Sequence, residues 1–261
     1  MKHILASPSK SAIRNPQSAI GRIVGYIYLI RHAQAGSRDN YDVLSDLGRE
    51  QARLLGEHLS RQGIQLEAVY AGGMQRQRHT AEIACEVIAS RGVAVPDVTT
   101  DERWNEFSLI SVYRAIAHRM IEDSPDFSRD YREMQDAIRR DPHTTGGATG
   151  RCDGAIIRAW MDARYDDYKG EAWTAFRERI RACGSRLSNG GSGKAIAVFT
   201  SATPVAILAA AALELSDEKL LSILGVIYNS GITVLRSRED DLRLFTFNST
   251  PHLEASQRTL R

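Results

Sequence analysis

The chain has 261 residues, of which 43% are hydrophobic and 25% are charged, and its formal net charge is +2. This length suits one large α/β domain or two small ones, with enough residues for a sizeable core. A net charge this small gives no reason to expect nucleic acid as a partner. The longest apolar run, residues 205–213, is too short to cross a bilayer, so we expect no membrane partner.

The cysteines are few and far apart. Cys85, Cys152 and Cys183 form no Cys-x-x-Cys pair, and an odd number cannot all pair with one another. This usage favours a reducing, cytoplasmic compartment and argues against a disulfide framework or a zinc site. We therefore expect no bound metal.

Residues 1–22 differ from the rest in composition. They contain Ser, Pro, Asn and Gln but no acidic residue, and the first acid is Asp39. Such a leader can be a transit peptide, but we favour a disordered tail or an over-extended start. We expect a single domain over residues 23–250 and a polar tail over 251–261.

The first half of the chain alternates strands and helices. Residues 26–30 are apolar and aromatic, which predicts a buried strand ending at Arg31-His32. After a loop over residues 36–42, Ser45 is the expected N-cap of a helix that ends at Gly63. A second strand over residues 66–70 and a second helix ending near Gly92 follow.

The second half is less regular at first. Residues 93–100 form a connection, and residues 107–170 are predicted to be a lid insertion with helical pieces rather than a separate domain. Residues 171–187 have the spacing of an amphipathic helix. A strand over 195–199 is followed by a helix that we expect to open at Pro204 with Thr203 as its cap. Two strands, residues 232–235 and 242–247, complete the pattern.

This alternation predicts an α/β protein. Strands separated by helices form a mostly parallel sheet, and such a sheet is covered on both faces. The expected architecture therefore has three layers, α/β/α, with the lid added to it.

Polar residues follow three of the predicted strands. Arg31 and His32 end the first strand, Arg76 follows the second, and residues 200–203 follow a later strand at the start of a helix. Ligands of open α/β sheets bind at the carboxyl ends of the strands. Two guanidinium groups and a helix N-terminus suit a phosphate.

Within such a pocket, a neutral His32 could attack phosphorus and carry the phosphoryl group. Glu106 could protonate the leaving oxygen if apolar surroundings keep its carboxyl protonated, although Asp101 and Glu102 are nearby alternatives. Ser201 and Gln34 are further candidates for contacting the phosphoryl group. The arginines would neutralise the phosphate, so no cofactor or metal is expected.

The ordered motifs resemble the histidine phosphatase superfamily, which includes the cofactor-dependent phosphoglycerate mutases. Residues 29–34 resemble its Arg-His-Gly signature, and Asn105-Glu106-Phe107 resembles the segment that carries its acid. Three further segments resemble family motifs over residues 44–52, 70–82 and 229–233. By this resemblance the fold is phosphoglycerate mutase-like, His32 is the phosphohistidine nucleophile, Arg31 and Arg76 bind the phosphoryl group, and Glu106 is the proton donor.

The sequence also departs from that pattern. Ala33 replaces the usual glycine after the histidine, Gly72 replaces a usual serine, and Ser201 stands where the family usually has a second histidine. The Ser201 turn resembles a bacterial branch with Thr-Ser-Gly-Gly-Pro there. Because Ser201 brings no positive charge, activity could be weakened unless another group, such as His79 or His252, fills the gap.

Three functions stay open at this point. The first is a phosphatase acting on a small phosphorylated molecule or a phosphoprotein. A mutase would require a lid that retains its product, and a phosphate-binding protein without catalysis is the third possibility. The sequence indicates neither the substrate nor the oligomeric state.

Overall fold

The computed structural model describes residues 25–37, 40–189, 195–238 and 241–260. The predictions for residues 1–22 lie outside these ranges. Strands form one six-stranded sheet in the order β3-β2-β4-β1-β5-β6. The strands of the sheet are β1 (Gly25–Arg31), β2 (Leu66–Ala71), β3 (Val98–Thr100), β4 (Ala195–Thr200), β5 (Ile232–Arg238) and β6 (Asp241–Ser249).

The sheet is mostly parallel, as predicted. Strands β3, β2, β4 and β1 run parallel to one another, whereas the β1–β5 and β5–β6 pairs are antiparallel. In the β1–β4 register Arg31 lies opposite Thr200, so the carboxyl ends of these two central strands meet. The residues that follow them therefore share one edge of the sheet.

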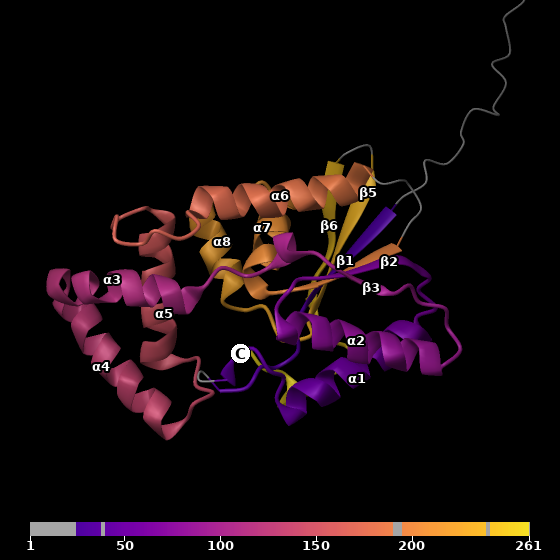
Figure 1. The fold of residues 1–261 in the computed structure, drawn as a ribbon, viewed down its shortest axis with the longest axis horizontal. Coiled ribbons are helices and arrows are strands. Elements are labelled where there is room, and N and C mark those ends of the chain that lie inside the picture. The colour runs from indigo at the N-terminus through magenta and orange to yellow at the C-terminus, as the bar shows by residue number, and fades with distance from the viewer. Residues whose placement is uncertain (1–24, 38–39, 190–194, 239–240, 261) are drawn as a thin grey trace, which may run out of the picture.

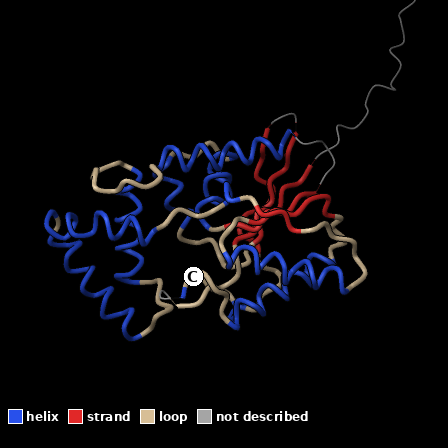
Figure 2. Tube along the Cα trace, in the orientation of Figure 1, coloured by secondary structure: helices blue, strands red, loops and turns tan. Residues whose placement is uncertain are grey.

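Helices cover both faces of the sheet (Figure 1). On one face α1 (Asp46–Arg61) and α2 (Gln75–Ser90) bury Leu55, Leu59 and Ile88 against the strands. On the other face α6 (Trp173–Asn189) and α7 (Ala202–Ala212) enclose a second apolar cluster. The tube in Figure 2 shows the strands between these helices. The three-layer prediction is thus confirmed.

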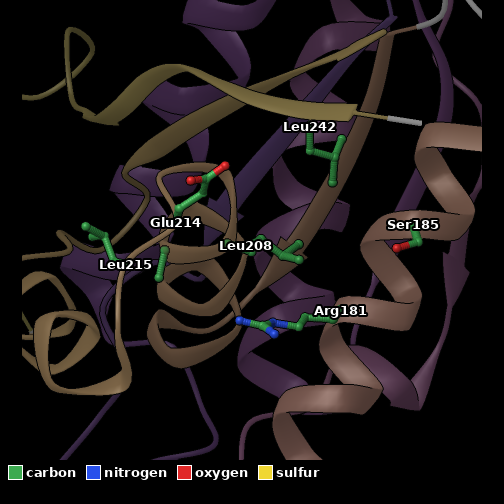
Figure 3. Close-up of a pocket in the computed structure, with 8 residues that line it drawn as sticks. Arg181, Ser185, Leu208, Glu214, Leu215 and Leu242 are labelled. Atoms are coloured by element: carbon green, nitrogen blue, oxygen red, sulfur yellow. The ribbon is translucent and has the colours of Figure 1, made fainter. Parts of the chain in front are cut away.

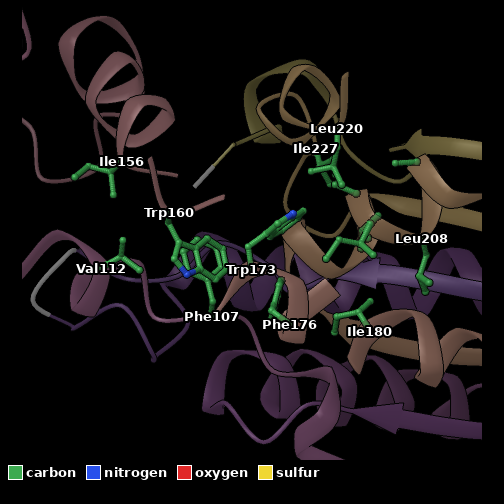
Figure 4. Packing of buried hydrophobic residues seen from close by; sticks show 14 of the residues in the cluster. Phe107, Val112, Ile156, Trp160, Trp173, Phe176, Ile180, Leu208, Leu220 and Ile227 are labelled. Carbon is green, nitrogen blue, oxygen red and sulfur yellow. The ribbon is translucent and has the colours of Figure 1, made fainter. Parts of the chain in front are cut away.

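The predicted lid consists of α3 (Leu109–Asp123), α4 (Pro125–Arg140) and α5 (Gly147–Met161), which extend to one side of the sheet (Figure 1). It shares the core of the main body. The rings of Phe107 and Trp160 stack with centroids 4.3 Å apart, and Phe176 of α6 meets Phe107 edge-on (Figure 4). Aromatic pairs of this kind fix geometry as well as burying area. The insertion is therefore anchored at its base.

Three elements differ from expectation. The connection over residues 93–100 contains the short strand β3, and α8 (Asp217–Leu224) was not predicted. Helix α7 begins at Ala202, so the prediction that Pro204 opens it with Thr203 as cap is wrong. Proline is tolerated there because the first-turn N–H groups of a helix have no intrahelical acceptor.

The residues expected as a polar tail pack onto the domain in their described part. His252 and Leu253 are buried, and Thr259 accepts a hydrogen bond from the Asn229 backbone N–H at 2.8 Å. No helix among the described residues has both the length and the apolar character needed to cross a bilayer.

Candidate active site

His32 lies directly beyond β1 and is almost fully buried. Its backbone N–H donates to the Thr200 carbonyl at 2.8 Å, which joins it to the end of β4. The ring Nδ1 lies 2.8 Å from the Ala33 carbonyl oxygen. A carbonyl can only accept, so Nδ1 carries the ring proton and Nε2 carries the lone pair.

The surroundings of His32 keep its imidazole neutral. Burial lowers the pKa of His32 well below its ordinary value, and the nearby charges of Arg76 and Arg31 lower it further. Arg76 Nε donates to His32 Nε2 at 3.1 Å. The nucleophilic nitrogen thus accepts a hydrogen bond from a guanidinium group, and a phosphoryl group bound to Arg76 would replace that bond and lie next to the lone pair.

Both predicted arginines are buried in the same place. Arg31 donates through Nη1 to the Ile227 carbonyl and shares a side-chain hydrogen bond with Tyr41. Its Nε has no hydrogen-bond partner within the described part of the chain. Burial lowers the pKa of Arg31, but an arginine keeps its charge in proteins. An unpaired buried donor beside His32 suits an anionic ligand.

Glu106 is held by two backbone groups. Its Oε1 accepts from the Phe107 N–H at 3.1 Å and its Oε2 from the Thr203 N–H at 3.0 Å, in the first turn of α7. Burial raises the pKa of Glu106, and the bonds from Thr203 and the charge of Arg76 oppose that rise. The net rise favours a protonated carboxyl.

The neighbouring acids lie in different settings. Asp101 forms an ion pair with Arg103, with 2.6 Å between Oδ2 and Nη2, and Glu102 is exposed. The hydrogen bond from Arg103 lowers the pKa of Asp101, whereas burial raises the pKa of Glu106.

Ser201 and Gln34 have other side chains as partners. Ser201 is buried in the turn between β4 and α7, and its Oγ accepts from Gln77 Nε2 at 2.9 Å. The side-chain carbonyl of Gln34 accepts from the Ser45 hydroxyl at 2.7 Å, beside the N-terminus of α1. The structure therefore brings His32, Arg31, Arg76 and Glu106 together, with Ser201 on the adjoining turn.

Two residues at the site were missed by the sequence reasoning. Asp42 accepts from Arg76 Nη1 at 2.9 Å and from the Gln75 N–H at 3.2 Å. The guanidinium of Arg76 lies over the ring of Tyr41, 4.8 Å from its centroid. Both lie within the loop predicted over residues 36–42, whose composition gives no signal. They reach Arg76 because the loop folds back through a bridge between Ala35 and Leu44.

Side chains from three other segments hold the backbone of residues 32–34 in place. Thr80 Oγ1 accepts from the Ala33 N–H at 3.0 Å, and the Asn229 amide donates to the His32 carbonyl at 3.1 Å. Gln51 accepts from the Gln34 N–H at 2.7 Å. A Cβ on Gly48 would lie 2.0 Å from the Gln34 carbonyl oxygen, so only glycine allows α1 to approach this closely. All four occur in the ordered motifs, which was the available signal.

His79 and His252 were considered as replacements for the second histidine of the family, and the structure gives each its own surroundings. His252 contacts the Ser230 hydroxyl at 3.0 Å and packs beside His58, and His79 Nδ1 has no hydrogen-bond partner in the described ranges.

No group of three or more His, Cys, Asp or Glu within the described ranges is placed to hold a metal ion. An open groove of about 270 Å³ between α6, α7 and β6 includes none of the candidate site residues (Figure 3).

The arrangement is chemically equipped for phosphoryl transfer. A neutral nucleophile faces two cations, and a carboxyl with a raised pKa lies within the electrostatic reach of both Arg31 and Arg76. Phosphoryl transfer depends mainly on positioning and on neutralising charge, which these groups supply.

Comparisons with known proteins show the family and the fold of the chain. A family model described as the histidine phosphatase superfamily (branch 1) matches residues 27–156 and 144–250. A search of curated proteins gives no match. Among solved structures, a mycobacterial hydrolase (Mycobacterial hydrolase 2) is 19% identical with a TM-score of 0.58, covering 90% of this chain and 94% of its own.

Two further structures share the fold. Phosphoglycerate mutase from Bacillus anthracis is 15% identical with a TM-score of 0.60, covering 88% of this chain and 96% of its own. Mycobacterial glucosyl-3-phosphoglycerate phosphatase is 20% identical with a TM-score of 0.54, covering 86% of this chain and 99% of its own. Because the family model spans most of the sequence, the chain belongs to the histidine phosphatase superfamily.

Proposed function

We propose that the protein is a phosphomonoester hydrolase that works through a phosphohistidine on His32. The observation that carries this proposal is the neutral, buried imidazole whose Nε2 lone pair faces the Arg76 guanidinium. Nε2 attacks phosphorus, the bond from phosphorus to the leaving oxygen breaks, and Glu106 gives that oxygen its proton. The Glu106 carboxylate then takes a proton from water, whose oxygen attacks phosphorus and releases inorganic phosphate and neutral His32.

Arg31 and Arg76 neutralise the phosphoryl charge in both steps, so the proposed reaction needs no metal. The substrate class is a small phosphate monoester or a phosphoprotein. Ser201 offers a hydroxyl but no positive charge, and we expect a lower rate than a second histidine would give. Within the described part of the chain the three cysteines are buried and form no disulfide, which supports the proposal of a cytoplasmic location.

The test has two parts. The wild-type protein is incubated with a broad panel of phosphate monoesters in EDTA, and the quenched protein is analysed for an acid-labile phosphate on His32. We expect phosphate release together with a phosphohistidine that maps to residue 32. A protein that turns over none of the panel would contradict the proposal.

A mutase is distinguished by its product. Incubation with 3-phosphoglycerate and its bisphosphate primer gives a phosphate-shifted isomer with a mutase, and free phosphate with a hydrolase. A protein that binds phosphate but never forms phosphohistidine would be a binding protein.

A further inference from the structure

Gln77 is buried on α2, directly after Arg76, and it contacts the turn that carries Ser201. Its Nε2 donates to Ser201 Oγ at 2.9 Å, a contact between residues 124 positions apart in the chain. Both side chains are essentially inaccessible to water. A buried amide bonded to a buried hydroxyl at the edge of a phosphate site suggests a role beyond packing.

The orientation of the Gln77 amide is determined by its other partners. Its Nε2 also donates to the Trp104 carbonyl at 3.4 Å, and its Oε1 accepts from the Met74 N–H at 3.4 Å. A carbonyl cannot donate and a backbone N–H cannot accept, so the amide cannot be reversed. Gln77 must therefore present an N–H to Ser201.

This fixed donor determines what the hydroxyl of Ser201 can do. Since Ser201 Oγ accepts from Gln77, its own proton is directed elsewhere, and the described residues include no recorded acceptor for it. The adjoining residue Thr200 receives the His32 N–H at 2.8 Å. Ser201 thus directly follows the residue whose carbonyl holds the His32 backbone, and its O–H is available to an acceptor such as a phosphoryl oxygen.

Gly72 provides the space for this arrangement. A Cβ at position 72 would lie 2.0 Å from Gln77 Oε1 and 2.7 Å from its Cδ. Contacts that short would displace the amide, so the Gln77 side chain can occupy this place only when residue 72 is glycine. The position of the Gln77 side chain thus depends on the glycine at position 72.

We propose that Gln77 is a positioning residue that directs the Ser201 hydroxyl toward the phosphoryl group on His32, in space that Gly72 leaves open. This inference rests on the proposed function of the same site. It predicts that Gln77 and Ser201 act as one unit, and that removing either one removes the same hydrogen bond to the phosphoryl group.

A double-mutant cycle tests the coupling. Gln77→Met keeps the side-chain length but removes the donor, and Ser201→Ala removes the hydroxyl. We expect each to lower kcat about tenfold with little change in KM, which corresponds to one hydrogen bond to a charged group. The double variant should also lose about tenfold, and each should weaken vanadate binding to a similar degree. Gln62→Met, at an exposed glutamine at the end of α1, is the matched control.

Gly72→Ala extends the cycle. It should reproduce the loss seen in Gln77→Met and cost nothing further when combined with it. If Gln77→Met fails to fold, Gln77→Asn replaces it, because that change keeps the amide but withdraws it by one methylene group. Melting temperatures near that of the wild type separate positioning from stability.

The outcomes are distinguishable. If the wild-type protein forms phosphohistidine but the single losses multiply to about a hundredfold, the inference about Gln77 is overturned and the proposed function stands. If the wild-type protein forms no phosphohistidine and turns over no monoester, the proposed function fails first.

Discussion

Two histidines of this protein, His32 and His252, are buried and neutral, but they have different charged neighbours. His32 lies at the carboxyl end of β1, and His252 lies in the segment after β6. Burial is the largest cause of the lowered pKa in both. The second cause differs, because the charges of Arg76 and Arg31 lower the pKa of His32 whereas His58 lowers that of His252.

The comparison shows that a neutral buried imidazole does not by itself indicate catalysis. His32 has its proton bound to the Ala33 carbonyl and its lone pair turned toward a cation. His252 contacts the Ser230 hydroxyl, and its Nδ1 has no partner in the described part of the chain. What distinguishes the two is the charge that Nε2 faces, since only a cationic site attracts a phosphate.

Replacing each histidine with alanine tests the difference between His32 and His252, and it should give the largest effect. We expect His32→Ala to lower kcat/KM by roughly 10³-fold or more, because it removes the nucleophile. His252→Ala should keep the activity within a few-fold but lower the free energy of unfolding by about 1–3 kcal/mol, through lost packing and an unpaired Ser230 hydroxyl. Steady-state kinetics and urea denaturation measure the two effects. Equal activity losses would show that the comparison is mistaken.

Glu106→Gln tests whether Glu106 is the proton donor for the leaving oxygen. An amide cannot give a proton to the leaving oxygen, so hydrolysis of an alkyl phosphate should fall by roughly 10²-fold or more. An aryl phosphate with an acidic leaving group needs no such proton, and its hydrolysis should fall much less. A rate survey over leaving groups of rising pKa checks this. The same loss for every leaving group would exclude Glu106 as the donor.

Lowering the pH should act on the fold through His252. Its pKa in the folded protein is about 4, whereas the unfolded chain binds the proton near the ordinary value of about 6.5. Below that value the unfolded state takes up more protons, so stability falls as the pH drops toward 4. We expect a loss of about 2 kcal/mol between pH 7 and pH 5 from this residue.

Urea denaturation of the wild type and of His252→Gln at both pH values isolates that contribution, since His32 and His58 titrate in both proteins. An identical loss in the two proteins would show that His252 contributes nothing.

Asp42→Asn should have the smallest effect. Asp42 lies 2.9 Å from Arg76 Nη1 and is about half exposed, so it offsets part of the positive charge that an anion would meet. Its removal should tighten vanadate binding by about two- to fivefold, in line with a partly exposed ion pair. Asp46→Asn, at an exposed position nearby, should leave the affinity unchanged. Weaker binding would indicate that Asp42 orients Arg76 rather than competing with the ligand.

The sequence predicted the features that are local. Strand ends such as Arg31-His32, the N-cap Ser45 and the amphipathic helix over 171–187 depend on neighbours a few residues away, and they lie close to where the patterns put them. The short strand β3 was missed because three residues carry too little periodicity. The start of α7 was misjudged because proline is accepted throughout a first turn.

Contacts between distant segments were beyond prediction. The bond from Gln77 to Ser201 and the ion pair of Asp42 with Arg76 depend on how α2, the β4–α7 turn and the first loop meet in space. Gly72 could be noted as a departure from the family pattern, but its meaning emerges only with Gln77 beside it.

Residues 257 and 259, near the end of the described chain, connect Gln51 of α1 with Asn229. Gln51 donates to the Gln257 carbonyl at 2.7 Å and to Thr259 Oγ1 at 3.0 Å, and Thr259 in turn bonds Asn229, which holds the His32 carbonyl. Truncation before residue 257 would remove the bonds of Gln257 and Thr259, so the loop that carries His32 should be held less firmly in the truncated protein.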